Sequence, residues 1–144
     1  MNISILDDYT DTLRKLPGFN RLAGHNVKIW NDHTKDTDQL AERLKDTEVL
    51  IPIRDRTPIR APLIERLDRL KLISARGTYP YIDVPALTRK GVLLCTSLPN
   101  RAAPSYSTAE LSWGLLIACM RRIPQQMAQL RAGKWQTEVG YGLR

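Results

Sequence analysis

Short apolar runs alternate with amphipathic stretches through residues 1–99, and this alternation limits the fold more than any other feature of the chain. Most of the runs are continuous, as in strands that are covered on both faces. The apolar runs are residues 3–6, 27–30, 49–53, 70–75 and 92–97, and the helix candidates between them are 9–16, 36–45, 60–68 and 84–90. The pattern predicts an α/β fold: a flavodoxin-like, doubly wound parallel sheet of five strands with helices on both faces.

The segment after residue 99 reads differently. The sequence STAE at 107–110 has the Ser-x-x-Glu form of a capping box, so we expect a helix to begin at Ser107. This helix runs through WGLLIACM at 113–120 and meets Pro124, which either kinks it or opens a second helix that Gly133 closes. A helix that is apolar on every side is buried between two bodies, and the five-stranded unit covers only one side of it.

Composition excludes several classes of protein. The chain has 144 residues, of which 42% are hydrophobic and 26% charged, as in globular proteins, and its longest apolar run falls far short of the roughly 20 residues that cross a membrane. The net charge of +7 is spread along the chain without the aromatic and basic pattern of a nucleic-acid site, so we expect no nucleic acid and no membrane as partners. No signal peptide opens the chain, which favours the cytoplasm, and Cys95 and Cys119 are expected to be buried, reduced packing residues.

Ligands of doubly wound sheets bind at the carboxyl ends of the strands. Asp7 and Asp8 follow the first apolar run, and the charged sequence RDRT at 54–57 follows the third. An acidic pair and a later Asp also occur in receiver domains, but the fifth run has no lysine after it, which disfavours that reading. Turn and helix capping therefore explains Asp7 and Asp8 better than metal binding does.

The ordered sequence from LKLISARGTYPYID at 70–83 to AGKW at 132–135 resembles the D-isomer-specific 2-hydroxyacid dehydrogenases. Within it, KGV at 90–92 and AEL at 109–111 fall in that family's order and spacing. The resemblance implies a substrate-binding domain over 1–99, and over 100–144 a linking helix that begins a truncated Rossmann nucleotide-binding domain.

The resemblance also implies chemistry. Family members transfer a hydride between NAD or NADP and a 2-hydroxy or 2-oxo acid. By the resemblance, the arginine, histidine and acidic residue that do so would lie beyond residue 144, so no catalytic residue is named. The chain alone is expected to be inactive and to bind no cofactor. His25 and His33 match none of the three and are taken as turn or surface residues. The substrate carboxylate would meet a loop aligned with Arg76, Gly77 and Thr78, where only the middle residue keeps the family's glycine.

Two further residues follow from the resemblance. Arg54 stands in place of the family's arginine after the third strand and would line the same cleft, and Thr108 matches a position near the nicotinamide. The helix at 107–123 would pair two copies of the chain into a homodimer. An alternative is a non-catalytic flavodoxin-like binding or assembly module.

Overall fold

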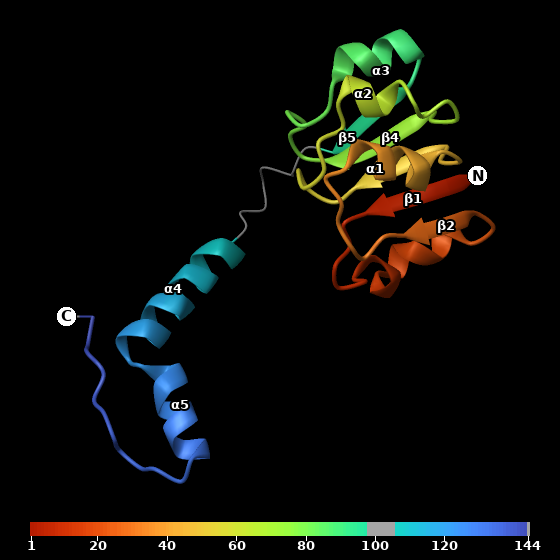
Figure 1. Cartoon of the computed structure of the whole chain (residues 1–144). Helices are drawn as coiled ribbons and strands as arrows, with labels where there is room; N and C mark the ends of the chain where they lie inside the picture. Colours follow the sequence, from red (N-terminus) through yellow and green to blue (C-terminus); the bar gives the residue numbers. More distant parts are fainter. Residues whose placement is uncertain (98–105, 144) are drawn as a thin grey trace. The chain divides into compact units, whose positions relative to one another are not determined.

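The computed structural model describes residues 1–97 and 106–143. The chain divides into two compact units, Met1–Pro99 and Asn100–Arg144, which are described separately (Figure 1).

The first unit is built on a five-stranded sheet in which every strand pair is parallel. The strands are β1 Asn2–Leu6, β2 Asn26–Ile29, β3 Val49–Pro52, β4 Leu72–Arg76 and β5 Leu93–Ser97, and their order is β2-β1-β3-β4-β5. The strand β1 therefore lies inside the sheet, and the chain moves outward from it in both directions. The predicted α/β fold and its five parallel strands are confirmed.

Three α-helices bury one face of the sheet: α1 Thr37–Leu44, α2 Ala61–Ile64 and α3 Val84–Lys90. Leu44, Ile64 and Leu87 on these helices belong to one core cluster with Leu50 and Ile73 of the sheet, and none of the five is more than 1% exposed. Acidic side chains begin two of the helices, since Asp36 accepts from the N–H groups of Asp38 and Gln39, and Asp83 accepts from that of Ala86.

The helix predicted over 9–16 is wrong. The chain instead forms two 3₁₀ segments, η1 Leu13–Lys15 and η2 Pro17–Leu22, because Asp8 accepts from the N–H groups of Thr12 and Leu13, and Pro17 and Gly18 interrupt any longer helix. The helix predicted over 60–68 is also shorter, since the chain after Ile64 continues in turns with bonds between residues three apart. The expected helices on both faces are thus reduced to α-helices on one face.

The opposite face of the sheet carries an apolar row that crosses all five strands. Val27, Ile3, Val49, Leu72 and Leu93 are register partners in that order. The row is buried at Ile3 and Val49, but Leu93 on the edge strand β5 is 68% exposed. Cys95 lies on the same side of β5 and is exposed, so the prediction that it packs in a core is wrong.

The second unit is a pair of helices, α4 Ser107–Met120 and α5 Ile123–Arg131, followed by an extended tail. Pro124 lies in the first turn of the second helix and does not kink the first, which confirms one of the two expected alternatives. The capping box is wrong: Tyr106 is the N-cap, and Ser107 is already helical, so its hydroxyl caps nothing. The tail folds back, since Tyr141 N–H donates to the Met120 carbonyl at 2.8 Å and the Gln126 amide donates to the Glu138 carbonyl at 2.6 Å.

Large apolar side chains are exposed all along α4. Trp113 is 59% exposed, Leu115 62% and Leu116 43%. Cys119 is exposed as well, so the prediction that it is buried is wrong. None of the residues of α4 is buried by the other described residues. Among the described helices, none has the length and apolar character needed to cross a membrane.

Candidate functional site

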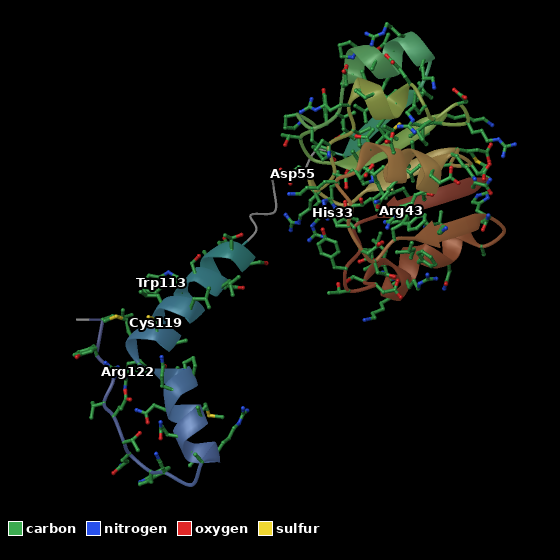
Figure 2. The ribbon with its side chains drawn as sticks, viewed as in Figure 1. His33, Arg43, Asp55, Trp113, Cys119 and Arg122 are labelled. Atoms are coloured by element: carbon green, nitrogen blue, oxygen red, sulfur yellow. The ribbon has the colours of Figure 1, made fainter. Side chains whose placement is uncertain are left out.

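Three neighbouring strands end in the left-handed region of the backbone. Asp7 follows β1 with φ 64°, Arg54 lies two residues after β3 with φ 61°, and Gly77 follows β4 with φ 83°. Each residue turns its chain at the carboxyl edge of the sheet, where ligands of this fold class bind. Figure 2 labels His33 and Asp55 on this side, toward which the strand arrows of Figure 1 point.

Asp7 is the centre of a buried hydrogen-bond network. Its carboxylate, 2% exposed, accepts from Thr57 Oγ1 at 2.7 Å and lies 2.9 Å from His33 Nδ1. Arg56 Nη1 donates to the Asp7 carbonyl at 2.6 Å, so the loop after β3 is held to the end of β1 by both its arginine and its threonine.

This network changes the expected roles of several residues. His33 is not a free surface residue, since it ties the segment after β2 to Asp7, and its side chain is 24% exposed. Asp8 caps the turn at Thr12, as predicted, whereas Asp7 caps nothing. In the described part of the chain no three His, Cys, Asp or Glu side chains gather as a metal site would require.

The loop after β4 is fixed from the side of β5. Gly77 N–H donates to the Ser97 carbonyl at 2.9 Å, and Thr96 Oγ1 donates to the Gly77 carbonyl at 2.6 Å. Arg76 and Thr78 are exposed on either side of this anchored glycine. The loop thus presents one cationic side chain and a rigid backbone to the solvent at the carboxyl edge.

The loops after β3 and β4 are joined to each other. Ile59 N–H donates to the Tyr81 carbonyl, and Asp83 N–H donates to the Ile59 carbonyl, both at 2.9 Å. Tyr81 is 6% exposed, and its hydroxyl has no hydrogen-bond partner within the described ranges. Burial raises the pKa of Tyr81, and the negative charge of Asp55 raises it further.

An open apolar depression of about 420 Å³ adjoins the loop after β4. It is lined by Thr78, Tyr79, Pro80, Ile82, Val84 and Pro85. Neither Arg54 nor Arg76 lines it, so the depression lies beside the charged loops rather than between them.

The structure brings Arg54 and the stretch 76–78 to the same edge of the sheet, on loops that follow adjacent strands. Thr108 lies in the second unit, exposed in the first turn of α4, where its carbonyl accepts from the Ser112 hydroxyl. The assignment of these residues to a substrate and a cofactor stays a prediction. The sequence did not predict the contacts of Thr57, Tyr81 and Thr96, because each joins segments that are far apart in the chain and leaves no local pattern.

The β2-β1-β3-β4-β5 order of the parallel sheet, with left-handed residues after three of its strands, defines a flavodoxin-like α/β unit. The sequence pattern of the D-isomer specific 2-hydroxyacid dehydrogenase catalytic domain matches residues 4–139. The chain belongs to this family.

Individual relatives agree. The chain is 39% identical over 118 residues to D-3-phosphoglycerate dehydrogenase of Methanocaldococcus jannaschii, and 38% identical over 141 residues to that of Rattus norvegicus. These matches cover 81% and 97% of this chain but only 21% and 25% of the relatives. The crystal structure of a phosphoglycerate oxidoreductase from Vibrio cholerae O395 superposes with a TM-score of 0.82 at 43% identity, covering 97% of this chain and 45% of that one.

Proposed function

We propose that this chain supplies the acid-binding part of an oxidoreductase that acts on 2-hydroxy and 2-oxo acids. The observation that supports the proposal is the anchored loop after β4, in which Arg76 and Thr78 are exposed on either side of Gly77 at the carboxyl edge of the sheet. A backbone N–H and a guanidinium are complementary to a carboxylate, and the guanidinium adds charge-assisted hydrogen bonds. Arg54 on the adjacent loop would contact the same acid group.

In the complete protein a nicotinamide dinucleotide, NAD or NADP, would accept or supply the hydride. Two observations support the proposal that this chain alone does not hold the dinucleotide: the 144 residues contain no G-x-G-x-x-G sequence, and Thr108 is a single exposed residue at the beginning of a helix. The 144-residue polypeptide by itself is proposed to bind the acid and to transfer no hydride.

A titration of the isotope-labelled chain with oxamate, a stable analogue of a 2-oxo acid, tests the acid site. We expect amide signals of residues 76–78 and of Arg54 to move with one common dissociation constant. Arg76→Gln should weaken binding about tenfold, since a hydrogen bond to a charged group contributes about 1.5–3 kcal/mol. Arg89→Gln is the matched control, because Arg89 is a 63% exposed arginine on α3, away from these loops, and should bind as the parent does.

Signals that do not move, or that move equally in both variants, would contradict the acid site. The chain would then be better explained as a non-catalytic binding or assembly module on the same fold.

We further propose a homodimer formed through the helix at 107–123. Its support is the exposure of Trp113, Leu115 and Leu116 on α4, because monomeric proteins rarely leave contiguous apolar surface of this kind in water. An isologous contact would cover the same helix in both copies.

A further inference from the structure

We propose that Thr96 is a positioning residue for the acid site, whose hydroxyl sets the direction in which the Thr78 amide points. This inference rests on the proposed function and concerns a residue on the neighbouring strand β5. It begins from the short bond, 2.6 Å, that Thr96 Oγ1 donates to the Gly77 carbonyl.

The planarity of the peptide bond turns this contact into an orientation. In a trans peptide the carbonyl of one residue and the N–H of the next point in opposite directions. Because the Gly77 carbonyl points at Thr96 on β5, the Thr78 N–H points away from β5. On its other side β4 pairs with β3, and the loop after β3 carries Arg54.

The Thr78 N–H finds no acceptor among residues 1–97 and 106–143, whereas the Gly77 N–H donates to the Ser97 carbonyl. An anion that contacts this loop would meet a Thr78 N–H whose direction the bond from Thr96 has already set.

Glycine at position 77 makes a fixing contact necessary. Its φ of 83° is reached readily by glycine, and nothing lies within 4 Å of the position where a Cβ would stand. A glycine in open space is able to rotate its two flanking peptides into other arrangements, some of which turn the Thr78 N–H elsewhere. The bonds from Thr96 and to Ser97 select one arrangement before the acid arrives, which lowers the entropy lost on binding.

The test replaces only the hydroxyl. Thr96→Val keeps the shape of the side chain and removes the donor, whereas Thr96→Ser keeps the donor. Thr88→Val is the matched control, because Thr88 Oγ1 also donates to a backbone carbonyl, that of Val84 at 3.0 Å, but within α3. All variants are made in the full 144-residue chain.

Two readouts are recorded by nuclear magnetic resonance. The first is the carbonyl carbon of Gly77 without ligand, which should shift in Thr96→Val and return toward its original position in Thr96→Ser. The second is the Thr78 amide during titration with oxamate. We expect Thr96→Val to weaken binding about threefold to tenfold, as the loss of one neutral hydrogen bond would, with Thr96→Ser close to the parent and Thr88→Val unchanged.

The outcomes separate the two proposals. If the Thr78 amide of the parent chain does not respond to oxamate, the proposed function fails and the role of Thr96 in it fails too. If the parent responds and Thr96→Val responds with the same affinity, or if its Gly77 carbonyl signal is unmoved, the acid site stands and the positioning role of Thr96 is wrong. A loss of binding that Thr96→Ser does not restore also contradicts the role of the hydroxyl.

Discussion

At the scale of single residues, Asp7 holds together the loops at the carboxyl edge of the sheet. Its partner Thr57 is 50 positions away in the sequence and its partner His33 is 26 positions away. A carboxylate that is 2% exposed needs such partners, because an unpaired buried charge is strongly unfavourable. The loop that carries Arg54 is therefore positioned by Asp7, which follows β1.

Replacing Asp7 with Asn should destabilise the sheet unit. Asn adopts the left-handed backbone readily, so the change acts on the side chain: an amide nitrogen would face a donor where an oxygen now accepts. We expect a loss of about 1–3 kcal/mol in the free energy of unfolding, measured with urea. Asp11→Asn is the control, because Asp11 forms an exposed ion pair with Arg14 and should change stability by less than about 1 kcal/mol. Equal losses in both variants would show that the Asp7 network contributes nothing particular.

At the scale of elements, the sequence predicted the strands better than the helices. Each strand overlaps a predicted apolar run, and most of these runs are continuous because a parallel strand covered on both faces has few polar positions. The segment 9–16 has helical periodicity, but the chain forms 3₁₀ turns there. The Asp8 carboxylate accepts from backbone N–H groups four and five residues later, and Pro17 begins the second turn. The apolar run of β5 likewise did not reveal that Leu93 and Cys95 would be exposed, since burial depends on which element lies opposite.

The candidate site was predictable in part for the same reason. Arg54 and the stretch 76–78 follow apolar runs, so sequence alone places them at the carboxyl edge of a parallel sheet. Thr96 and Thr57 contribute through hydrogen bonds across strands, and a one-residue change in register would have turned Thr96 to the other face.

Gly140 packs closely against the backbone at the end of α4. A Cβ at this position would lie 2.5 Å from the Cα of Arg121, so the tail and the end of α4 could not keep their contact. We expect Gly140→Ala to release the tail, which would speed hydrogen exchange at the Tyr141 amide, the donor to Met120. Gly114→Ala is the control, because nothing lies within 4 Å of its Cβ position and alanine favours a helix interior by about 1 kcal/mol.

Exchange at Tyr141 that is as slow in Gly140→Ala as in the parent would show that the tail keeps its contact with α4 without a glycine at this position. Faster exchange in both variants would instead point to a general loss of the helix pair.

At the scale of the whole molecule, the proposed homodimer depends on the exposed apolar side chains of helix α4. Leu116→Gln together with Met120→Gln should weaken self-association on the order of ten-thousandfold, since a two-fold contact loses both side chains in both copies and burying each contributes about 1.5 kcal/mol or more. Sedimentation velocity over a range of concentrations measures this. Leu16→Gln is the control, because Leu16 is a 48% exposed leucine in the sheet unit and should leave the association unchanged. A parent chain that sediments as a monomer at high micromolar concentration would contradict the proposed dimer.

The residues in the left-handed region after β1 and β3 lower the stability of the sheet unit, and one of them is proposed to bind the acid. Only one of the three turns at this edge uses glycine, while Asp7 and Arg54 hold side chains at φ values that are unfavourable for them. Substituting glycine at Arg54 would relieve that strain and remove the guanidinium that the acid is proposed to meet. Engineering aimed only at thermal tolerance would therefore select against binding at this loop, and improvements that leave binding intact have to be sought in the helix-covered core.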